Sequence, residues 1–169
     1  MSSPARDRPV MPDGYGVPES GDGLLEWSVV EARLVESLHY WMATTRPDGR
    51  PHVVPRWGAW LSGALYYDGS PDTLHARNAG ANPACTLHIG DGREAIMLDG
   101  ITAASEPLLG TPAESLSAEI GRKYGGLGYQ PEADSWSGAD AGGLMVFRPS
   151  KALAWFDFPT DLTRFRFEP

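Results

Sequence analysis

Short β-rich segments separated by turn sequences constrain the fold of this chain most strongly. From His39 to Tyr67 the sequence is rich in aromatic and β-branched residues, and it is divided by the turns Arg46-Pro47-Asp48-Gly49 and Ser62-Gly63. Such runs predict strands joined by hairpins. Further strands are predicted at 84–89, 94–105, 144–148, 152–158 and 163–167. This many short strands favour a mainly β fold, a small and mostly antiparallel β-barrel with peripheral helices, over a βαβ sheet.

Three segments show helical patterns. An apolar stripe of period three to four begins near Asp22 and continues through Val30, Leu34 and Leu38. Residues 73–81 predict a short helix, and residues 111–124 predict a longer one that opens with a capping box. Residues 125–142 are rich in glycine and predict a loose connection.

Pro55 interrupts the second predicted strand, His52 to Trp60. Proline has no backbone N–H to donate to a ladder, so we expect a bulge or an end of pairing at this position. Backbone amides near it would then be free for a ligand or for water.

Length and composition indicate one globular domain. Residues 1–23 are rich in Pro, Gly, Ser and Asp and predict a flexible leader, so the folded domain is expected to span residues 24–169. No apolar run is long enough for a membrane span, and the N-terminus has no signal or transit pattern. The single cysteine, Cys85, excludes an internal disulfide and fits a reducing cytoplasm.

The net charge of −8 and the absence of any run of Lys or Arg argue against nucleic acid as a partner. The four histidines His39, His52, His75 and His88 lack the spacing of a zinc site, so no metal is predicted. No hydrolase or phosphate-loop motif occurs. An enzyme of this sequence would therefore take its reactive atoms from a cofactor.

Two groups of residues are candidates for binding such a cofactor. His75, Arg77 and Asn78 lie near the start of a predicted helix, where a phosphate would gain from the helix dipole; the alternative is a solvated helix face with one arginine. Arg56 and Trp57 are either ordinary barrel residues or part of a wall that contacts the cofactor ring. The residues alone leave both alternatives open.

The segments ATTRPDGRPHVVP (43–55) and ARNAGANP (76–83), together with the closing segment ALAWFDFPTDLTRFRF, resemble the pyridoxamine 5′-phosphate oxidase-like split-barrel family of flavin- and deazaflavin-binding proteins. The chain is most similar to the group in that family that includes oxidoreductases dependent on coenzyme F420. The similarity spans residues 24–167, which is nearly the whole predicted domain.

The resemblance implies a homodimeric split β-barrel with two cofactor sites at the subunit interface. The strand residues Val54, Pro55, Arg56, Trp57 and Gly58 would line the ring and its side chain. His75, Arg77 and Asn78 would hold the phosphate, and Lys151 and Trp155 of the second subunit would close the site. Many relatives carry Lys or Arg where this chain has His75, whose charge would depend on pH near neutrality.

The expected function is that of an oxidoreductase that uses coenzyme F420 or FMN for hydride transfer to a small organic substrate. The resemblance favours coenzyme F420, with FMN as the alternative. Trp57 or Tyr66 would stack on a ring, and no side chain is assigned a catalytic step. A second hypothesis is a non-catalytic carrier of a flavin, of coenzyme F420 or of heme. Oxidation of pyridoxamine phosphate itself is disfavoured because few cations are present for a second phosphate.

Overall fold

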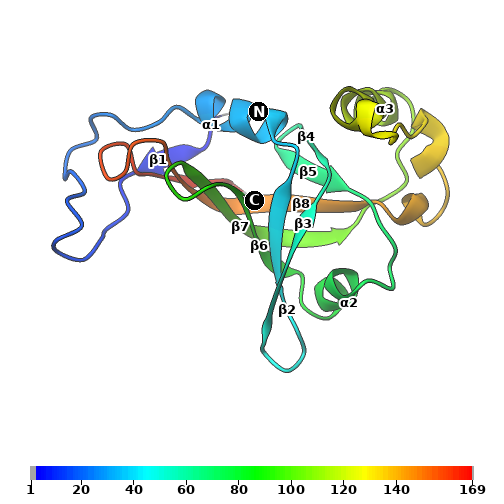
Figure 1. The fold of residues 1–169 in the computed structure, drawn as a ribbon, viewed down its shortest axis with the longest axis horizontal. Coiled ribbons are helices and arrows are strands. Elements are labelled where there is room, and N and C mark those ends of the chain that lie inside the picture. Colours follow the sequence, from blue (N-terminus) through cyan, green and yellow to red (C-terminus); the bar gives the residue numbers. More distant parts are fainter. Residues whose placement is uncertain (1–2, 169) are drawn as a thin grey trace.

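The computed structural model describes residues 3–168, which form nine strands and three α-helices (Figure 1). The helices are α1 (Trp27–Glu36), α2 (Leu74–Ala81) and α3 (Thr111–Tyr124). The strands are β1 (Ala5–Asp7), β2 (Tyr40–Thr45), β3 (Pro51–Arg56), β4 (Ala59–Leu61), β5 (Ala64–Tyr67), β6 (Ala84–Gly90), β7 (Ala95–Ala104), β8 (Met145–Trp155) and β9 (Thr163–Arg166).

One antiparallel sheet dominates the fold. Its strand order is β1-β9-β8-β7-β6-β2-β3, and the β4–β5 hairpin joins it through β5, which pairs with β8. In the described residues β3 has a strand neighbour on one side only, so the barrel does not close there. The predicted mainly β and mostly antiparallel fold with peripheral helices is confirmed.

Strand β8 corrects one prediction. The sequence predicted two strands, 144–148 and 152–158, but the structure has a single strand of 11 residues. Its first part pairs with β5 and its later part with β9, and Pro149 lies between the two, opposite Gly100. The pairing register between β7 and β8 shifts at this point. Such an irregularity lets the strand continue past Pro149, which has no N–H to donate to the ladder.

The N-terminal segment is also more ordered than its composition predicted. Within the expected leader, β1 pairs with β9, and Asp7 accepts hydrogen bonds from Arg164 and Arg166. These two guanidinium groups lower the pKa of Asp7 to about 2. A three-residue strand held by side chains more than 150 residues away leaves no periodic signal in the sequence.

Pro55 does not end the pairing of its strand. It lies opposite Trp41 in an unbroken β2–β3 register that runs from Tyr40 and Arg56 to Thr45 and Pro51. The expected bulge is therefore wrong. The missing donor is tolerated because β3 is an edge strand, so that a proline N can face away from β2.

Two apolar cores support these elements. Val30 and Leu34 of α1 join the sheet core, whereas Leu38 lies beyond the helix and is exposed. The second core packs α3 against the segment 125–142, which contains three short 3-10 turns and the buried Trp136. That segment was predicted to be loose, but it packs against α3. This packing helps to hold α3 beside β4 (Figure 1).

Within residues 3–168, no α-helix has both the length and the apolar character needed to cross a bilayer.

Candidate functional site

Helix α2 lies against the β2–β3 hairpin and brings together part of the predicted site. Asn78 is buried, and its Nδ2 donates to Thr44 Oγ1 at 3.0 Å. His75, one turn earlier, is only 5% exposed. Arg56 lies close enough to His75 for its charge to affect the pKa of that histidine. Residues from β3 and α2 that are about 20 positions apart in the sequence therefore share one site.

Arg56 is the cation at the centre of this cluster. Its guanidinium donates to the carbonyl of Asp68, and it lies 5.5 Å from the centre of the Tyr67 ring. Its Nε is buried and has no hydrogen-bond partner, and Arg56 forms no ion pair with any residue of the described chain. A buried donor without an acceptor is costly, so an anionic ligand that accepts from it would stabilise the site.

Arg77 lies on the exposed face of α2. Its Nη1 donates to the carbonyl of Asp72 at 2.5 Å, and across residues 3–168 it has no carboxylate partner. The helix begins after Thr73, whose hydroxyl donates to Ser70 instead of capping the helix. In a chain of net charge −8, two arginines without counter-ions make this region suited to an anion.

His75 has a different charge state from the one expected. Desolvation by burial, with smaller contributions from the charges of Arg56 and His52, lowers its pKa to about 4. The imidazole is therefore neutral at pH 7 and does not titrate near neutrality, which corrects the sequence-based expectation. It also lines a cavity of about 1130 Å³, together with Tyr67, Ser70 and Tyr129.

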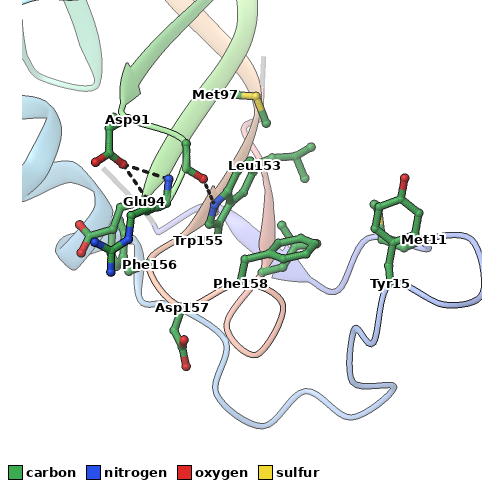
Figure 2. Close-up of a pocket in the computed structure, with 14 residues that line it drawn as sticks. Met11, Tyr15, Asp91, Glu94, Met97, Leu153, Trp155, Phe156, Asp157 and Phe158 are labelled. Carbon is green, nitrogen blue, oxygen red and sulfur yellow. Dashed lines mark hydrogen bonds between the residues drawn. The ribbon is translucent and has the colours of Figure 1, made fainter.

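Lys151 and Trp155 lie elsewhere in the same chain. Both are on β8, which is separated from β3 by three strands. Lys151 Nζ is 2.7 Å from an Asp99 carboxylate oxygen. Trp155, labelled in Figure 2, donates through Nε1 to the Gly92 carbonyl at 3.3 Å. Within one chain these two residues do not join the α2 cluster.

Val54, Pro55, Trp57 and Gly58 follow the edge of the barrel. Val54 is half-buried and Pro55 is exposed. The ring of Trp57 stacks on that of Tyr124 at 4.8 Å with an interplanar angle of 8°, and Trp57 Nε1 donates to His39 at 3.1 Å. Gly58 is buried directly behind it.

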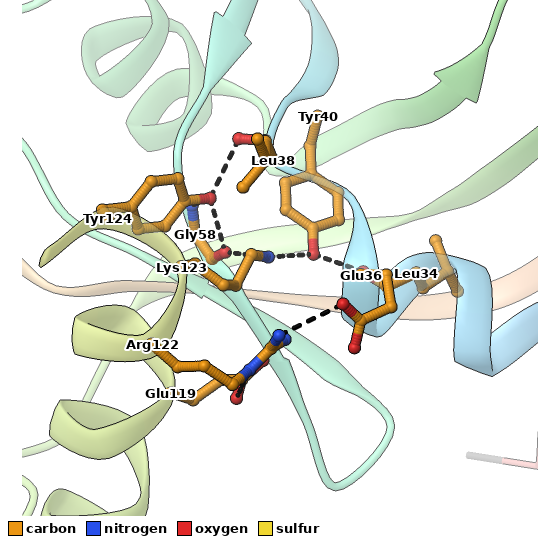
Figure 3. Close-up of polar contacts among 9 residues, drawn as sticks. All are labelled: Leu34, Glu36, Leu38, Tyr40, Gly58, Glu119, Arg122, Lys123 and Tyr124. Atoms are coloured by element: carbon orange, nitrogen blue, oxygen red, sulfur yellow. Dashed lines mark hydrogen bonds and ion pairs between the residues drawn. The ribbon is translucent and has the colours of Figure 1, made fainter. Parts of the chain in front are cut away.

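Two residues of α3 that the sequence analysis did not single out hold this turn. Tyr124 Oη accepts from the Gly58 N–H at 3.0 Å, and Lys123 Nζ donates to the Gly58 carbonyl at 2.8 Å and to Tyr40 Oη at 2.9 Å (Figure 3). Burial lowers the pKa of Lys123 to about 8. The sequence did carry a signal for Lys123. This lysine continues the buried helical stripe of Leu116 and Ile120, where a charged side chain is unusual.

The residues described by the structure contain no group of three or more His, Cys, Asp or Glu side chains arranged to hold a metal ion.

Comparison with solved structures places this geometry in a known fold. A protein described as an F420 reductase is 24% identical, with a TM-score of 0.52, and the match covers 84% of this chain and 98% of that one. A Listeria innocua protein provisionally described as a pyridoxamine 5′-phosphate oxidase is 16% identical, with a TM-score of 0.55 and coverage of 77% and 98%. A heme-binding protein from Mycobacterium smegmatis is 18% identical, with a TM-score of 0.60 and coverage of 80% and 56%.

The chain therefore has the split-barrel fold of the pyridoxamine 5′-phosphate oxidase-like proteins. No family model matches it, and no curated protein does. Because proteins of this fold include oxidoreductases as well as heme-binding proteins, the function has to be argued from the site.

Proposed function

We propose that this protein is a homodimeric oxidoreductase that binds coenzyme F420 or FMN and transfers hydride to a small organic substrate. The observation that carries the proposal is the pair of arginines without counter-ions, Arg56 and Arg77, beside α2 in an acidic chain. The likeness in fold to an F420 reductase supports it. The single cysteine, Cys85, is buried and free, as expected for a protein that acts in a reducing compartment such as the cytoplasm.

The phosphate would be held by Arg56, Arg77 and the start of α2. Arg56 offers a buried donor and Arg77 an exposed charge. Asn78 is engaged with Thr44 and is better suited to fixing α2 on the hairpin than to donating to a ligand. His75, neutral at pH 7, adds no charge and would act only as a polar neighbour.

The ring of the cofactor would lie along the open edge of β3. Pro51 and Pro55 have no N–H, so the edge facing away from β2 offers backbone carbonyls and the N–H of Val53. A flavin or deazaflavin ring has both donors and acceptors on its pyrimidine edge and can match such a strand. Trp57, fixed by Tyr124, would bound the ring at the end of the strand.

The bound cofactor would supply the hydride chemistry. The protein would contribute position and exclusion of water: Lys123 and Tyr124 fix the Gly58 turn, and the apolar side chains of Trp57 and Val54 limit solvent at the ring. No side chain of this chain needs to form a covalent bond to the substrate.

A second copy of the chain would cover the outward face of the sheet. One row across neighbouring strands exposes Pro55 and Trp41, and it exposes His88 in part. The exposed apolar surface of this row, Pro55 and Trp41, is suited to an interface. Lys151 and Trp155 lie on the same face and would reach the cofactor groove of the other subunit, where the resemblance expects them.

The test is cofactor titration of arginine variants. We expect Arg56→Ala to cost about 1.5–3 kcal/mol of binding free energy for FMN or coenzyme F420, because it removes a charge-assisted bond at a partly buried position. Arg77→Ala should cost less, about 0.5–1 kcal/mol, because solvent screens an exposed charge. Arg148→Ala, an exposed arginine on β8, is the matched control and should leave the dissociation constant unchanged. Dissociation constants that are the same in all three variants and the parent would refute the phosphate site.

The second candidate is a heme or cofactor carrier without turnover, which the likeness to the Mycobacterium smegmatis heme-binding protein favours. The two functions are separated by absorption spectra and by turnover. A Soret band after addition of heme, with no spectral change with FMN or coenzyme F420, would select the carrier. Oxidation of the reduced cofactor only when an electron acceptor is present would select the enzyme.

A further inference from the structure

The N-terminal segment closes on itself through one arginine. Arg8 donates to the carbonyls of Leu162 at 2.7 Å and Ser20 at 3.1 Å, and also to that of Asp22. Residues 9–20 therefore begin and end beside the Arg8 guanidinium, and they are called the strap below. The strap also runs beside the turn after β8, where a Cβ added to Gly16 would lie 3.6 Å from Pro159 Cγ. Hydrogen bonds thus hold both ends of this loop, and it forms an ordered part of the structure.

The strap forms one wall of a cavity of about 1010 Å³, called the strap pocket below. Met11 and Tyr15 stand on the strap side, and the sheet side presents apolar side chains from β7, β8 and the following turn (Figure 2). The latter are Met97, Leu153, Trp155, Phe158 and Leu162. The rings of Trp155 and Phe158 meet edge to face at 5.7 Å. Aromatic walls on one side and a tyrosine on the other suit a flat ring.

The charges around the strap pocket disfavour anions. Its polar rim contains three carboxylates, Asp91, Glu94 and Asp157, against one guanidinium, Arg93. Glu94 is paired with Arg33, so Asp91 and Asp157 stand against Arg93 and the rim keeps a net negative charge. This is the opposite electrostatic character to that of the arginine cluster beside α2, so a phosphate would not be drawn here.

We propose that the strap pocket binds a planar aromatic molecule that carries no negative charge. The chemical class of the ligand follows from the pocket alone. That this ligand is the substrate of the enzyme would rest on the proposed function. In that arrangement Trp155 would touch both the cofactor of one subunit and the ligand in the strap pocket, which would bring the ligand next to the ring.

Two fluorescent probes with the same ring system test the ligand class on the full-length protein without added cofactor. N-phenyl-1-naphthylamine is neutral, and 8-anilinonaphthalene-1-sulfonate is its sulfonated counterpart. We expect the neutral probe to bind at least about tenfold more tightly. Asp157→Lys should strengthen binding of the sulfonate and leave the neutral probe unaffected. Equal affinities for the two probes, or no binding of the neutral one, would overturn the proposal.

Four alanine variants test whether the neutral probe binds in the strap pocket. Tyr15→Ala and Phe158→Ala should each weaken the neutral probe by about fivefold or more, and Arg8→Ala, which frees the strap, should do the same. Leu109→Ala removes an apolar side chain that is 67% exposed and lies outside the pocket, and it should have no effect. If all four variants bind alike while keeping the parental melting temperature, the probe is not in the strap pocket and the proposal is wrong. A protein that binds the probe as expected but no FMN or coenzyme F420 would refute the proposed function and leave the pocket in place.

Discussion

His75 and Arg56 lie together because α2 packs on the β2–β3 hairpin, and this contact changes what the histidine can do. The residue type alone suggested a group that titrates near neutrality. Burial, with a smaller contribution from the charge of Arg56, lowers its pKa to about 4. The proposed phosphate site would therefore depend more on Arg56, a residue for which the sequence pattern left a structural role open. The side chains that bury an imidazole come from distant parts of the chain and cannot be read from its neighbours.

The low pKa of His75 predicts a pH dependence of stability. Between the unfolded value of 6.5 and the folded value of about 4, the unfolded chain binds a proton at this histidine and the folded chain does not. The free energy of unfolding should thus fall as the pH falls through that range. His75→Gln keeps a polar group but cannot titrate, so its urea unfolding should vary less between about pH 7 and pH 4.5. Equal slopes in the two proteins would contradict this assignment.

Among the elements, those fixed by local sequence were predictable and those fixed by distant partners were not. The Ser62-Gly63 turn was predicted and has the positive φ values, 50° and 76°, that a two-residue hairpin needs. Helix α2 also follows its pattern: it ends at Ala81, and Asn82 caps it before Pro83. By contrast, β8 continues through Pro149 because its pairing partners change there, and β1 exists only because β9 offers it an edge.

The Gly58 turn gives a test at the scale of the element. A Cβ at Gly58 would lie 2.6 Å from the Tyr66 carbonyl oxygen and 3.0 Å from Leu65 Cδ1. Gly58→Ala should therefore cost about 1–3 kcal/mol of stability and displace Trp57. Gly80→Ala is the control, because a Cβ there meets no atom within 4 Å and should stabilise α2 by about 0.5–1 kcal/mol. Thermal or urea unfolding measures both, and a Gly58→Ala protein as stable as the parent would show that the turn has room.

At the scale of the whole molecule, the outward face of the sheet predicts the oligomeric state. Trp41 is 42% exposed and stacks on His88, with ring centres 6.3 Å apart and an interplanar angle of 11°. Trp41→Glu places a charge at the centre of the apolar row and should convert a dimer to a monomer in sedimentation velocity. Leu127→Glu, at an exposed position beyond α3, should leave the dimer intact. A parent protein that sediments as a monomer would show that the row has another role.

The candidate site could be predicted from the sequence only in part, for a reason that belongs to the whole molecule. The structure brings Arg56, His75 and Asn78 together, as expected, but it leaves Lys151 and Trp155 three strands away. The resemblance assigns these two residues to the second subunit of a proposed dimer, and a single chain would not complete such a site. The roles of Lys123 and Tyr124 were missed because they act through the backbone of Gly58, which carries no side chain to mark the contact.

The two prolines of β3 have a consequence for the behaviour of the protein in solution. An unpaired strand edge is a template on which other chains can add strands and aggregate. Pro51 and Pro55 remove two of the donors that such growth would use, so foreign strands cannot form a continuous ladder on this side. The same two prolines thus help to keep the chain dispersed at high concentration.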